Sequence, residues 1–176
     1  MSKERMMARV RIGRFSAVGA LLLAVLGGNL VSASPAAAND WFMLKNMNSG
    51  LCLHASSGGG PGAWVTQEVC NPGENNQWWT WQLGNSPDTV FQIQALKNFG
   101  SDACVDTYNG NNPGTVIMWY CTFTSSQYLA KTHLGGNLEN YMGMSVEPPG
   151  LSKQPGTQMI MWRTNGTLNQ QWTYYN

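Results

Sequence analysis

The chain has 176 residues, with ten Lys and Arg residues against nine Asp and Glu residues, a formal net charge of +1. Five of the cations lie before residue 15, and without that basic leader the remaining 138 residues carry five cations and eight acids, a net charge of −3. Such a sparse, slightly acidic surface argues against binding to nucleic acid or to anionic membranes, because both need clustered Lys and Arg.

The first 38 residues have the features of a secretory signal peptide. A basic start is followed by an apolar run over Ala17–Leu26 and by three alanines at 36–38, which form a small-residue cleavage site. A membrane anchor is the alternative, but it needs about 20 predominantly apolar residues, and Gly27 and Gly28 interrupt the run. We therefore expect cleavage after Ala38, a secreted extracellular protein, and no membrane insertion.

The composition after residue 38 is typical of an all-β protein with short strands. All eight tryptophans and all four cysteines lie there, together with most of the glycines, and we find no helical apolar stripe of useful length. In an exported chain an even number of cysteines indicates a disulfide framework, although four cysteines allow three pairings. The length of residues 39–176 suits a single domain.

The mature chain repeats itself. Leu44-Lys45-Asn46 recurs 52 residues later as Leu96-Lys97-Asn98, and Cys52 recurs at the same spacing as Cys104. A third copy follows without cysteines, and the alignment puts Ser145 and Thr164 at the two vacated cysteine positions. The three repeats cover about residues 41–84, 90–132 and 137–176.

Three units of short strands have few ways to bury their apolar faces. None of them is large enough to do so alone, so the three must share one core. Closing antiparallel strands around that core removes exposed sheet edges. We therefore predict a β-trefoil with pseudo-threefold symmetry. A three-bladed propeller is the structural alternative, but propellers typically have four to eight blades.

One motif occurs in phase in all three repeats: Gln77-Trp78-Trp79, Gln127-Tyr128-Leu129 and Gln170-Gln171-Trp172. With the cysteine pairs at matching spacing in the first two repeats, this pattern resembles the ricin B-type lectin family, whose signature is a threefold Q-x-W. The resemblance covers essentially all of residues 41–176. The departure is Leu129, where the second copy lacks its tryptophan.

The repeat and the resemblance together imply disulfides within repeats, Cys52 with Cys70 and Cys104 with Cys121. Each bridge closes a loop of under 20 residues, which stabilises the fold by roughly 3 kcal/mol. A metal site or redox pair is the alternative for these cysteines, but export favours disulfides and no Cys-x-x-Cys spacing occurs. We expect no metal and no cofactor.

Two sets of in-phase residues have structural interpretations. The large apolar positions that end each motif suit a shared core; they are Trp79, Leu129 and Trp172. The glutamines of the motif either tie loop backbone together or hold a pocket carboxylate in place; they are Gln77, Gln127 and Gln170.

The resemblance implies a sugar site built from an acid two residues after the first half-cystine, an aromatic residue just before the second, and Asn-Gln at the last strand. An aromatic face stacks against the sugar ring, while the polar groups satisfy its hydroxyls. The second repeat offers Asp106, Trp119 and Gln127, with Ser126 in place of the Asn. Tyr108 and Asn109 extend its rim.

The third repeat offers the complete set, Glu147, Trp162, Asn169 and Gln170, with a longer acid and an unbridged loop. The first repeat has His54 and Glu68 where the acid and the aromatic residue should be, and keeps only Asn76 and Gln77, so we expect no sugar there.

A further glutamine of the family is replaced in both candidate sites, by Ile117 and Ile160. This loss predicts a monovalent affinity on the order of 1 mM or poorer. Two weak sites still hold a polymer through multivalency.

Catalysis has little support in the sequence. The two histidines, His54 and His133, form no H-E-x-x-H pair. Residues 143–147 only approach the G-x-S-x-G nucleophile elbow, and Asp102 with Asp106 is the one candidate carboxylate pair.

We therefore expect a monomeric, non-catalytic lectin with a glycan or polysaccharide ligand. A protein-binding or inhibitory trefoil that has lost sugar binding is the second hypothesis, and a small secreted hydrolase the third.

Overall fold

Fourteen strands and five short 3-10 turns make up the regular structure of the described residues, none of which is in an α-helix. The computed structural model describes residues 41–83, 94–108, 113–132 and 136–176. The predicted leader, residues 1–38, lies outside these ranges, as do Asn109 and His133. No helix within them is long and apolar enough to cross a membrane.

Each repeat contributes a similar succession of strands. The first contains β1 (Met43–Asn46), β2 (Cys52–Ala55), β3 (Val65–Glu68) and β4 (Trp79–Leu83). The second contains β5 (Gln94–Asn98), β6 (Cys104–Asp106), β7 (Gly114–Thr115), β8 (Ile117–Trp119) and β9 (Ala130–Lys131). The third contains β10 (Leu138–Glu139), β11 (Met144–Glu147), β12 (Thr157–Gln158), β13 (Ile160–Arg163) and β14 (Trp172–Tyr175).

One-turn 3-10 segments occur at equivalent places in the repeats. Three of them precede the last strand of a repeat and contain the glutamine of the motif: η2 (Asn75–Gln77), η3 (Ser125–Gln127) and η5 (Leu168–Gln170). Two others follow the second strand of a repeat: η1 (Ser57–Gly59) and η4 (Pro149–Leu151).

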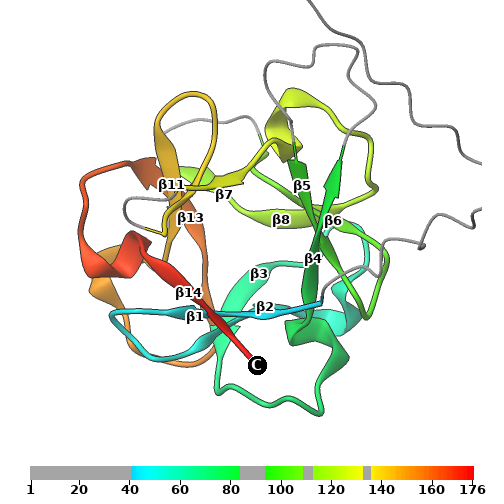
Figure 1. Cartoon of the computed structure of the whole chain (residues 1–176), viewed down its shortest axis with the longest axis horizontal. Helices are drawn as coiled ribbons and strands as arrows, with labels where there is room; N and C mark the ends of the chain where they lie inside the picture. Colours follow the sequence, from blue (N-terminus) through cyan, green and yellow to red (C-terminus); the bar gives the residue numbers. More distant parts are fainter. Residues whose placement is uncertain (1–40, 84–93, 109–112, 133–135) are drawn as a thin grey trace, which may run out of the picture. The chain divides into compact units, whose positions relative to one another are not determined.

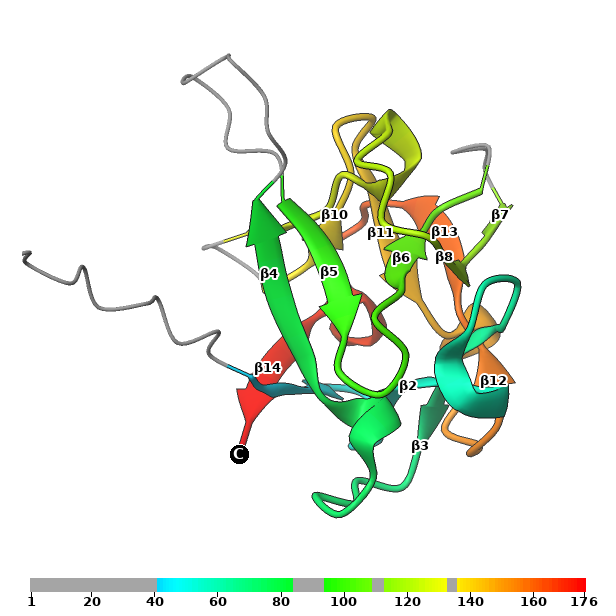
Figure 2. The ribbon, with the colours of Figure 1, turned by 90° about the vertical axis from the view of Figure 1, so that its right-hand side faces the viewer.

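The repeats close on one another in a ring. The last strand of each repeat pairs antiparallel with the first strand of the next, as β4 with β5, β9 with β10, and β14 with β1. Figure 1 shows the three repeats around a common centre, and Figure 2 shows β4, β5, β6 and β8 as one sheet. This closure between repeats is the β-trefoil that the sequence predicts. It excludes a propeller in which each repeat forms its own blade, because every sheet here combines strands of at least two repeats.

Three antiparallel hairpins cover the ring, β2 with β3, β6 with β8, and β11 with β13. They meet through a cycle of backbone hydrogen bonds. The amide of Val65 donates to the carbonyl of Val116 at 3.2 Å, that of Val116 to Met159 at 3.3 Å, and that of Met159 back to Val65 at 2.8 Å. All three side chains are fully buried, so this cycle marks the pseudo-threefold axis.

The core contains the apolar position of each motif, as predicted. Trp79, Leu129 and Trp172 are each at most 2 % exposed. The indole N–H of Trp79 donates to the carbonyl of Leu53, and that of Trp172 to the carbonyl of Val146, both at 3.1 Å. Leu129 fills the same position but has no donor, so the second repeat lacks this link from core to hairpin.

The cysteines pair within repeats, Cys52 with Cys70 and Cys104 with Cys121, as the resemblance implied. In the third repeat the hydroxyls of Ser145 and Thr164 lie 2.7 Å apart, at the positions that the alignment gives to cysteines. A hydrogen bond thus stands where the other two repeats have a covalent bridge.

Candidate functional site

The three hairpins share one register, which fixes the comparison between repeats. The acid of the second repeat, Asp106, pairs with Ile117, and the acid of the third, Glu147, pairs with Ile160. In the first repeat His54 takes the place of the acid. The alignment drawn from the sequence therefore holds residue by residue at these positions.

The second repeat carries a cavity of about 470 Å³, called pocket 2 from here on. Asp106, Trp119 and Tyr108 of the predicted site line it. Its full lining is Asp106, Thr107, Tyr108, Ile117, Trp119, Ser125, Ser126, Asn140, Tyr141 and Met142. Gln127 lies behind this wall and is fully buried.

Asp106 is held by two side chains of η3. The amide of Gln127 donates from Nε2 to Asp106 Oδ2 at 3.1 Å, and the hydroxyl of Ser126 donates to the same oxygen at 3.2 Å. Ser126 therefore takes over a bond for which the family pattern has an Asn. The other oxygen, Oδ1, accepts no hydrogen bond from the described residues, and it remains available to a ligand hydroxyl.

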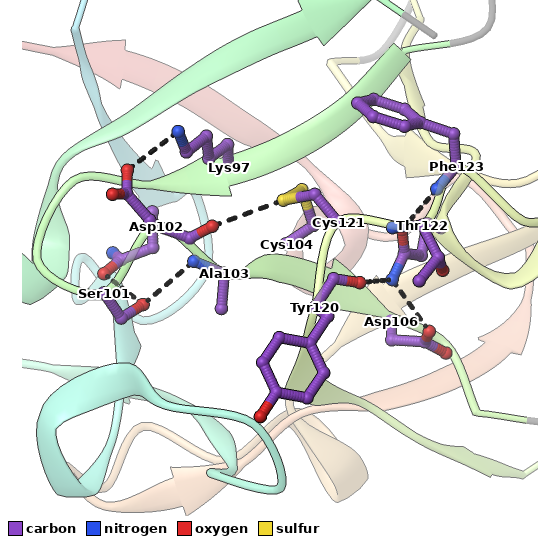
Figure 3. The surroundings of a disulfide bond; sticks show 12 residues. Lys97, Ser101, Asp102, Ala103, Cys104, Asp106, Tyr120, Cys121, Thr122 and Phe123 are labelled. Carbon is purple, nitrogen blue, oxygen red and sulfur yellow. Dashed lines mark hydrogen bonds and ion pairs between the residues drawn. A yellow bond between two sulfur atoms is a disulfide. The ribbon is translucent and has the colours of Figure 1, made fainter.

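Gln127 also organises the loop that follows β8, of which Figure 3 labels Tyr120, Thr122 and Phe123. Its Oε1 accepts from the backbone amides of Thr122 and Phe123, both at 2.9 Å, and its Nε2 donates to the carbonyl of Tyr120 at 2.7 Å. The ring of Tyr120 points away from Asp106. Both interpretations of this glutamine are therefore correct, because it ties the loop and holds the carboxylate.

One wall of pocket 2 comes from the third repeat. Asn140 precedes the turn between β10 and β11, and its Oδ1 accepts from the backbone amides of Met142 and Met144 at 3.0 and 3.1 Å. Those two bonds fix the orientation of the side-chain amide. Its Nδ2 donor has no hydrogen-bond partner among the described residues, and Asn140 lines the same cavity as Asp106.

The same asparagine position is used differently in the other repeats. Asn46 Nδ2 donates to the carbonyl of Asn169 at 2.8 Å, and Asn98 Nδ2 donates to that of Asn76 at 3.0 Å. For Asn140 the equivalent acceptor is the carbonyl of Ser126, which is taken by Thr107 through its amide and its hydroxyl. Only in pocket 2 is this donor left free for a ligand.

Aromatic side chains form the rim of pocket 2. Trp119 is 43 % exposed, and Tyr108 and Tyr141 are more exposed still. Exposed aromatic faces beside a buried carboxylate suit a ligand with one apolar face and a polar edge.

The four predicted residues of the third repeat also come together, and we call them site 3. Glu147 Oε2 accepts a 2.6 Å hydrogen bond from Gln170 Nε2. Burial raises the pKa of the Glu147 carboxyl, and hydrogen bonds from Gln170 and Asn169 partly oppose that shift. Asn169 is buried, whereas Trp162 is 39 % exposed. Site 3 thus repeats the arrangement of a buried acid, a supporting amide and an exposed indole.

The first repeat has a different arrangement. His54 Nδ1 lies 3.2 Å from the hydroxyl of Thr66, and burial lowers the pKa of His54, opposed by the charges of Glu68 and Glu74. The residue opposite Cys52, where Trp119 and Trp162 stand in the other repeats, is Glu68. At these two positions the first repeat therefore has neither a carboxylate held by the motif glutamine nor an indole.

Gln77 nevertheless keeps the loop contacts of its counterparts. Its Oε1 accepts from the amide of Asn71 at 2.8 Å, and its Nε2 donates to the carbonyl of Val69 at 2.9 Å. The glutamine therefore bonds to loop backbone in all three repeats and to a carboxylate in two.

Asp102 and Asp106, the candidate carboxylate pair of the hydrolase hypothesis, lie at different places in the structure. Asp102 lies in the turn before β6, where its side chain is 84 % exposed and forms an ion pair with Lys97 at 2.7 Å. Asp106 is the only acid among the residues that line pocket 2. The two acids do not share one site.

Sequence reasoning missed the contribution of the third repeat to pocket 2. Asn140, Tyr141 and Met142 lie in the turn after β10, and β10 pairs with β9, the last strand of the second repeat. The available signal was the phase of Asn46, Asn98 and Asn140, combined with the rule that each repeat of a trefoil is closed by the next.

Comparisons with known proteins show which family has this fold and these motifs. A family model described as "Ricin-type beta-trefoil lectin domain-like" matches residues 31–120. Comparison with curated protein sequences found no match.

Solved structures of low identity share the fold. A designed threefold-symmetric protein, ThreeFoil, is 23 % identical, with a TM-score of 0.65 over 77 % of this chain and 98 % of its own. The agglutinin of Rhizoctonia solani is 19 % identical, with a TM-score of 0.63 over 81 % of this chain and 98 % of its own. An exo-β-1,3-galactanase of Clostridium thermocellum, 1,3Gal43A, is 20 % identical, with a TM-score of 0.64 over 76 % of this chain but only 29 % of its own.

The family match spans half of the chain and agrees with the threefold closure, the in-phase glutamines and the paired cysteines. The chain belongs to the ricin-type β-trefoil lectin domain-like family.

Proposed function

We propose that the protein is a secreted, non-catalytic lectin that binds glycan through pocket 2 and site 3. One observation carries the proposal. In both places a buried carboxylate is held by the amide of the motif glutamine beside an exposed indole, and the first repeat has His54 and Glu68 at the two equivalent positions.

Pocket 2 offers the groups that a sugar needs. Asp106 Oδ1 is an acceptor for a hydroxyl, Asn140 Nδ2 is a donor, and Trp119 presents a face for the apolar side of the ring. The hydrogen bonds of Asp106 and Asn140 to protein groups fix both in place before a ligand arrives, which lowers the entropic cost of binding.

Weak affinity at each site is part of the proposal. Ile117 and Ile160 lie directly opposite the two acids and offer no hydrogen bond to a ligand. A monosaccharide should therefore bind with a dissociation constant on the order of 1 mM. A polymer that reaches both sites gains affinity through effective concentration.

Catalysis is not part of the proposal. Glycosidases use two carboxyl groups about 5 to 10 Å apart, and Asp106 is the single acid in the lining of pocket 2. The galactanase of similar fold is more than three times as long as its matched part, so attachment to an enzyme is one context in which such a domain occurs. It also makes galactan a reasonable probe.

Two features support the proposal of secretion. One is the leader that the sequence predicts, and the other is the pair of disulfides within the folded domain. Disulfides persist in oxidising compartments and are rare in the cytosol.

Retention on insoluble galactan, xylan and chitin, together with a glycan array, tests the proposal. We expect wild-type protein to be retained on at least one of them and Trp119→Ala with Trp162→Ala to be lost. Phe99→Ala is the matched control, since Phe99 is 48 % exposed in the turn after β5 and does not line pocket 2. Retention of the folded double variant would show that the sites are misassigned, and no retention of the wild type on any glycan would refute the lectin function.

A protein-binding trefoil is the second candidate. Trp41, Trp78 and Phe99 line a hollow of about 200 Å³ with Asn75, and none of these residues lines pocket 2. A secreted partner that is released by Phe99→Ala and not by free sugar would favour this function.

A further inference from the structure

Trp64 belongs to the first repeat but lies against the hairpin of pocket 2. It forms an antiparallel bridge with Ile117, flanked by a 2.8 Å hydrogen bond from the amide of Met118 to the carbonyl of Ala63 and by the bond from Val65 to Val116. Figure 1 shows β8 beside the start of β3. Directly opposed residues of antiparallel strands project to the same face of the sheet.

That face is the one that carries pocket 2. Along the β7–β8 segment Val116 and Met118 are buried, while Ile117 and Trp119 lie on the outer face and line the pocket. Ile117 is opposed by Asp106 on one side and by Trp64 on the other. Acid, isoleucine and indole thus form a row across three strands, over a distance of about 10 Å at the usual strand spacing.

Trp64, the bridge partner of Ile117, lines a second hollow. Its volume is about 400 Å³, and it is lined by Trp64, Ser56, Ser57 and the segment 60–63. Trp64 is 57 % exposed. The lining combines an aromatic face with two hydroxyls and contains no charged side chain, which suits a neutral, hydroxyl-rich ligand.

The other repeats lack this feature at the equivalent position. Thr115 opposes Ile160 beside site 3, and Gln158 opposes Thr66 in the first repeat. The pseudo-threefold axis therefore gives each site one residue from the preceding repeat, and only pocket 2 receives an aromatic one.

We propose that Trp64 and its hollow form a second sugar subsite of pocket 2, so that this pocket binds a linear, neutral oligosaccharide along its chain. One sugar unit occupies the Asp106–Trp119 region, and a following unit stacks on Trp64. Site 3, with Thr115 in place of the indole, binds one unit. The proposal rests on the lectin function proposed above.

Titration of linear oligomers against single sugars tests the subsite. The probes are galactose, xylose and N-acetylglucosamine, each as the monosaccharide and as the linear tetrasaccharide, and the background is Trp162→Ala so that pocket 2 is measured alone. We expect the tetrasaccharide of the accepted sugar to bind more tightly than its monosaccharide. Trp64→Ala should weaken the tetrasaccharide about ten-fold, the loss of one aromatic contact, and leave the monosaccharide unchanged.

Two further variants keep the test independent of folding defects in Trp64→Ala. Trp64→Phe retains a ring and should keep most of the preference for the longer chain. Thr115→Trp, in a Trp119→Ala background, should give site 3 a preference that it lacks in the same background without the change.

The outcomes separate the two proposals. Equal binding of monosaccharide and tetrasaccharide by pocket 2, or a preference that survives in folded Trp64→Ala protein, overturns the subsite and leaves the lectin function standing. Binding of no probe by either form overturns both. A dimer that Trp64→Ala dissociates, with chain-length preference unchanged, would assign the indole to self-association instead.

Discussion

The first and second repeats have the same hairpin register, the same short turn before the last strand and a disulfide at the same place, yet they differ in what their glutamines do. Gln77 bonds only to loop backbone, whereas Gln127 makes the same kind of loop contacts and also holds Asp106. The scaffold therefore requires the glutamine with or without a ligand. In the function proposed here, a sugar site also requires the acid at the end of the second strand and the indole opposite the first cysteine.

Replacing the glutamines separates these two roles, and it has the largest expected effect. Gln127→Ala removes the bonds of Gln127 to two backbone amides, one carbonyl and the Asp106 carboxylate, which then keeps only the bond from Ser126. At about 1 kcal/mol for each of these bonds, the free energy of unfolding should fall by about 4 kcal/mol. Glycan binding by pocket 2 should weaken as well, because Asp106 loses one of the two bonds that position it.

Gln77→Ala is the matched control, since it frees one amide and one carbonyl. We expect a loss of about 2 kcal/mol with unchanged glycan binding. Urea unfolding and glycan titration of both variants provide the measurement. If Gln77→Ala weakened binding as much as Gln127→Ala, the division between scaffold and site would be wrong.

Removal of a disulfide should have the next largest effect on the free energy of unfolding. Removing the disulfide of the second repeat with Cys104→Ala and Cys121→Ala should lower the free energy of unfolding by about 3 kcal/mol. The same change at Cys52 and Cys70 should cost a similar amount, because the two loops differ by one residue in length. A clearly unequal cost in denaturant unfolding would mean that the two hairpins are not braced alike.

The third repeat allows the reverse experiment. Ser145→Cys with Thr164→Cys should form a third disulfide, because the two hydroxyls occupy the bridged positions of the other repeats. The expected gain is about 2 kcal/mol, below the value of a native bridge, since engineered disulfides often deliver less. Mass spectrometry with and without reductant shows whether the bond forms, and two free thiols in the oxidised protein would contradict the equivalence.

The smallest effect concerns pH and compares site 3 with pocket 2. The pKa of Glu147 lies above its ordinary value of 4.5 because the carboxyl is buried. As the pH falls, this group takes up its proton before an ordinary glutamate does, and a sugar hydroxyl loses its charged acceptor. In the Trp119→Ala background, binding should therefore decrease several-fold between neutral pH and the ordinary range of glutamate.

The free energy of unfolding should change in the opposite direction and increase as the pH falls over the same range. The folded state holds the proton more tightly than the unfolded state, so ionisation of Glu147 costs folding free energy as the pH rises through its raised pKa. Glu147→Gln removes this dependence and is the control for both measurements. A binding curve that stays flat down to pH 4.5 in the wild-type site would contradict the assignment.

Much of this arrangement was accessible from the sequence, because the chain supplies three copies of itself. The spacing of cysteines and glutamines in two repeats predicted Ser145 and Thr164 as a vacated bridge in the third, and the structure places their hydroxyls together. The core role of Trp79, Leu129 and Trp172 followed from phase alone. When a sequence contains regular repeats, the structural role of a residue can be predicted from the residues at the equivalent positions.

Contacts between repeats were not accessible in the same way. Asn140 reaches pocket 2 from the next repeat, and Trp64 reaches its edge from the preceding one. Both depend on how three hairpins meet around the axis, which is decided by ring closure and not by spacing along the chain. The site residues nearest in sequence were predicted, and those brought in from other repeats were missed.

The cycle of hydrogen bonds from Val65 to Val116, to Met159 and back has no beginning and no end. Each repeat gives one bond to a neighbour and receives one from the other, so removing any repeat leaves both of its neighbours with an unmet backbone group. In this cycle the three repeats are equivalent, so no repeat is marked as the first or the last to be synthesised. A chain whose ends were joined and reopened between repeats would meet the same three partners, whereas a chain of two repeats would have no closed structure to form.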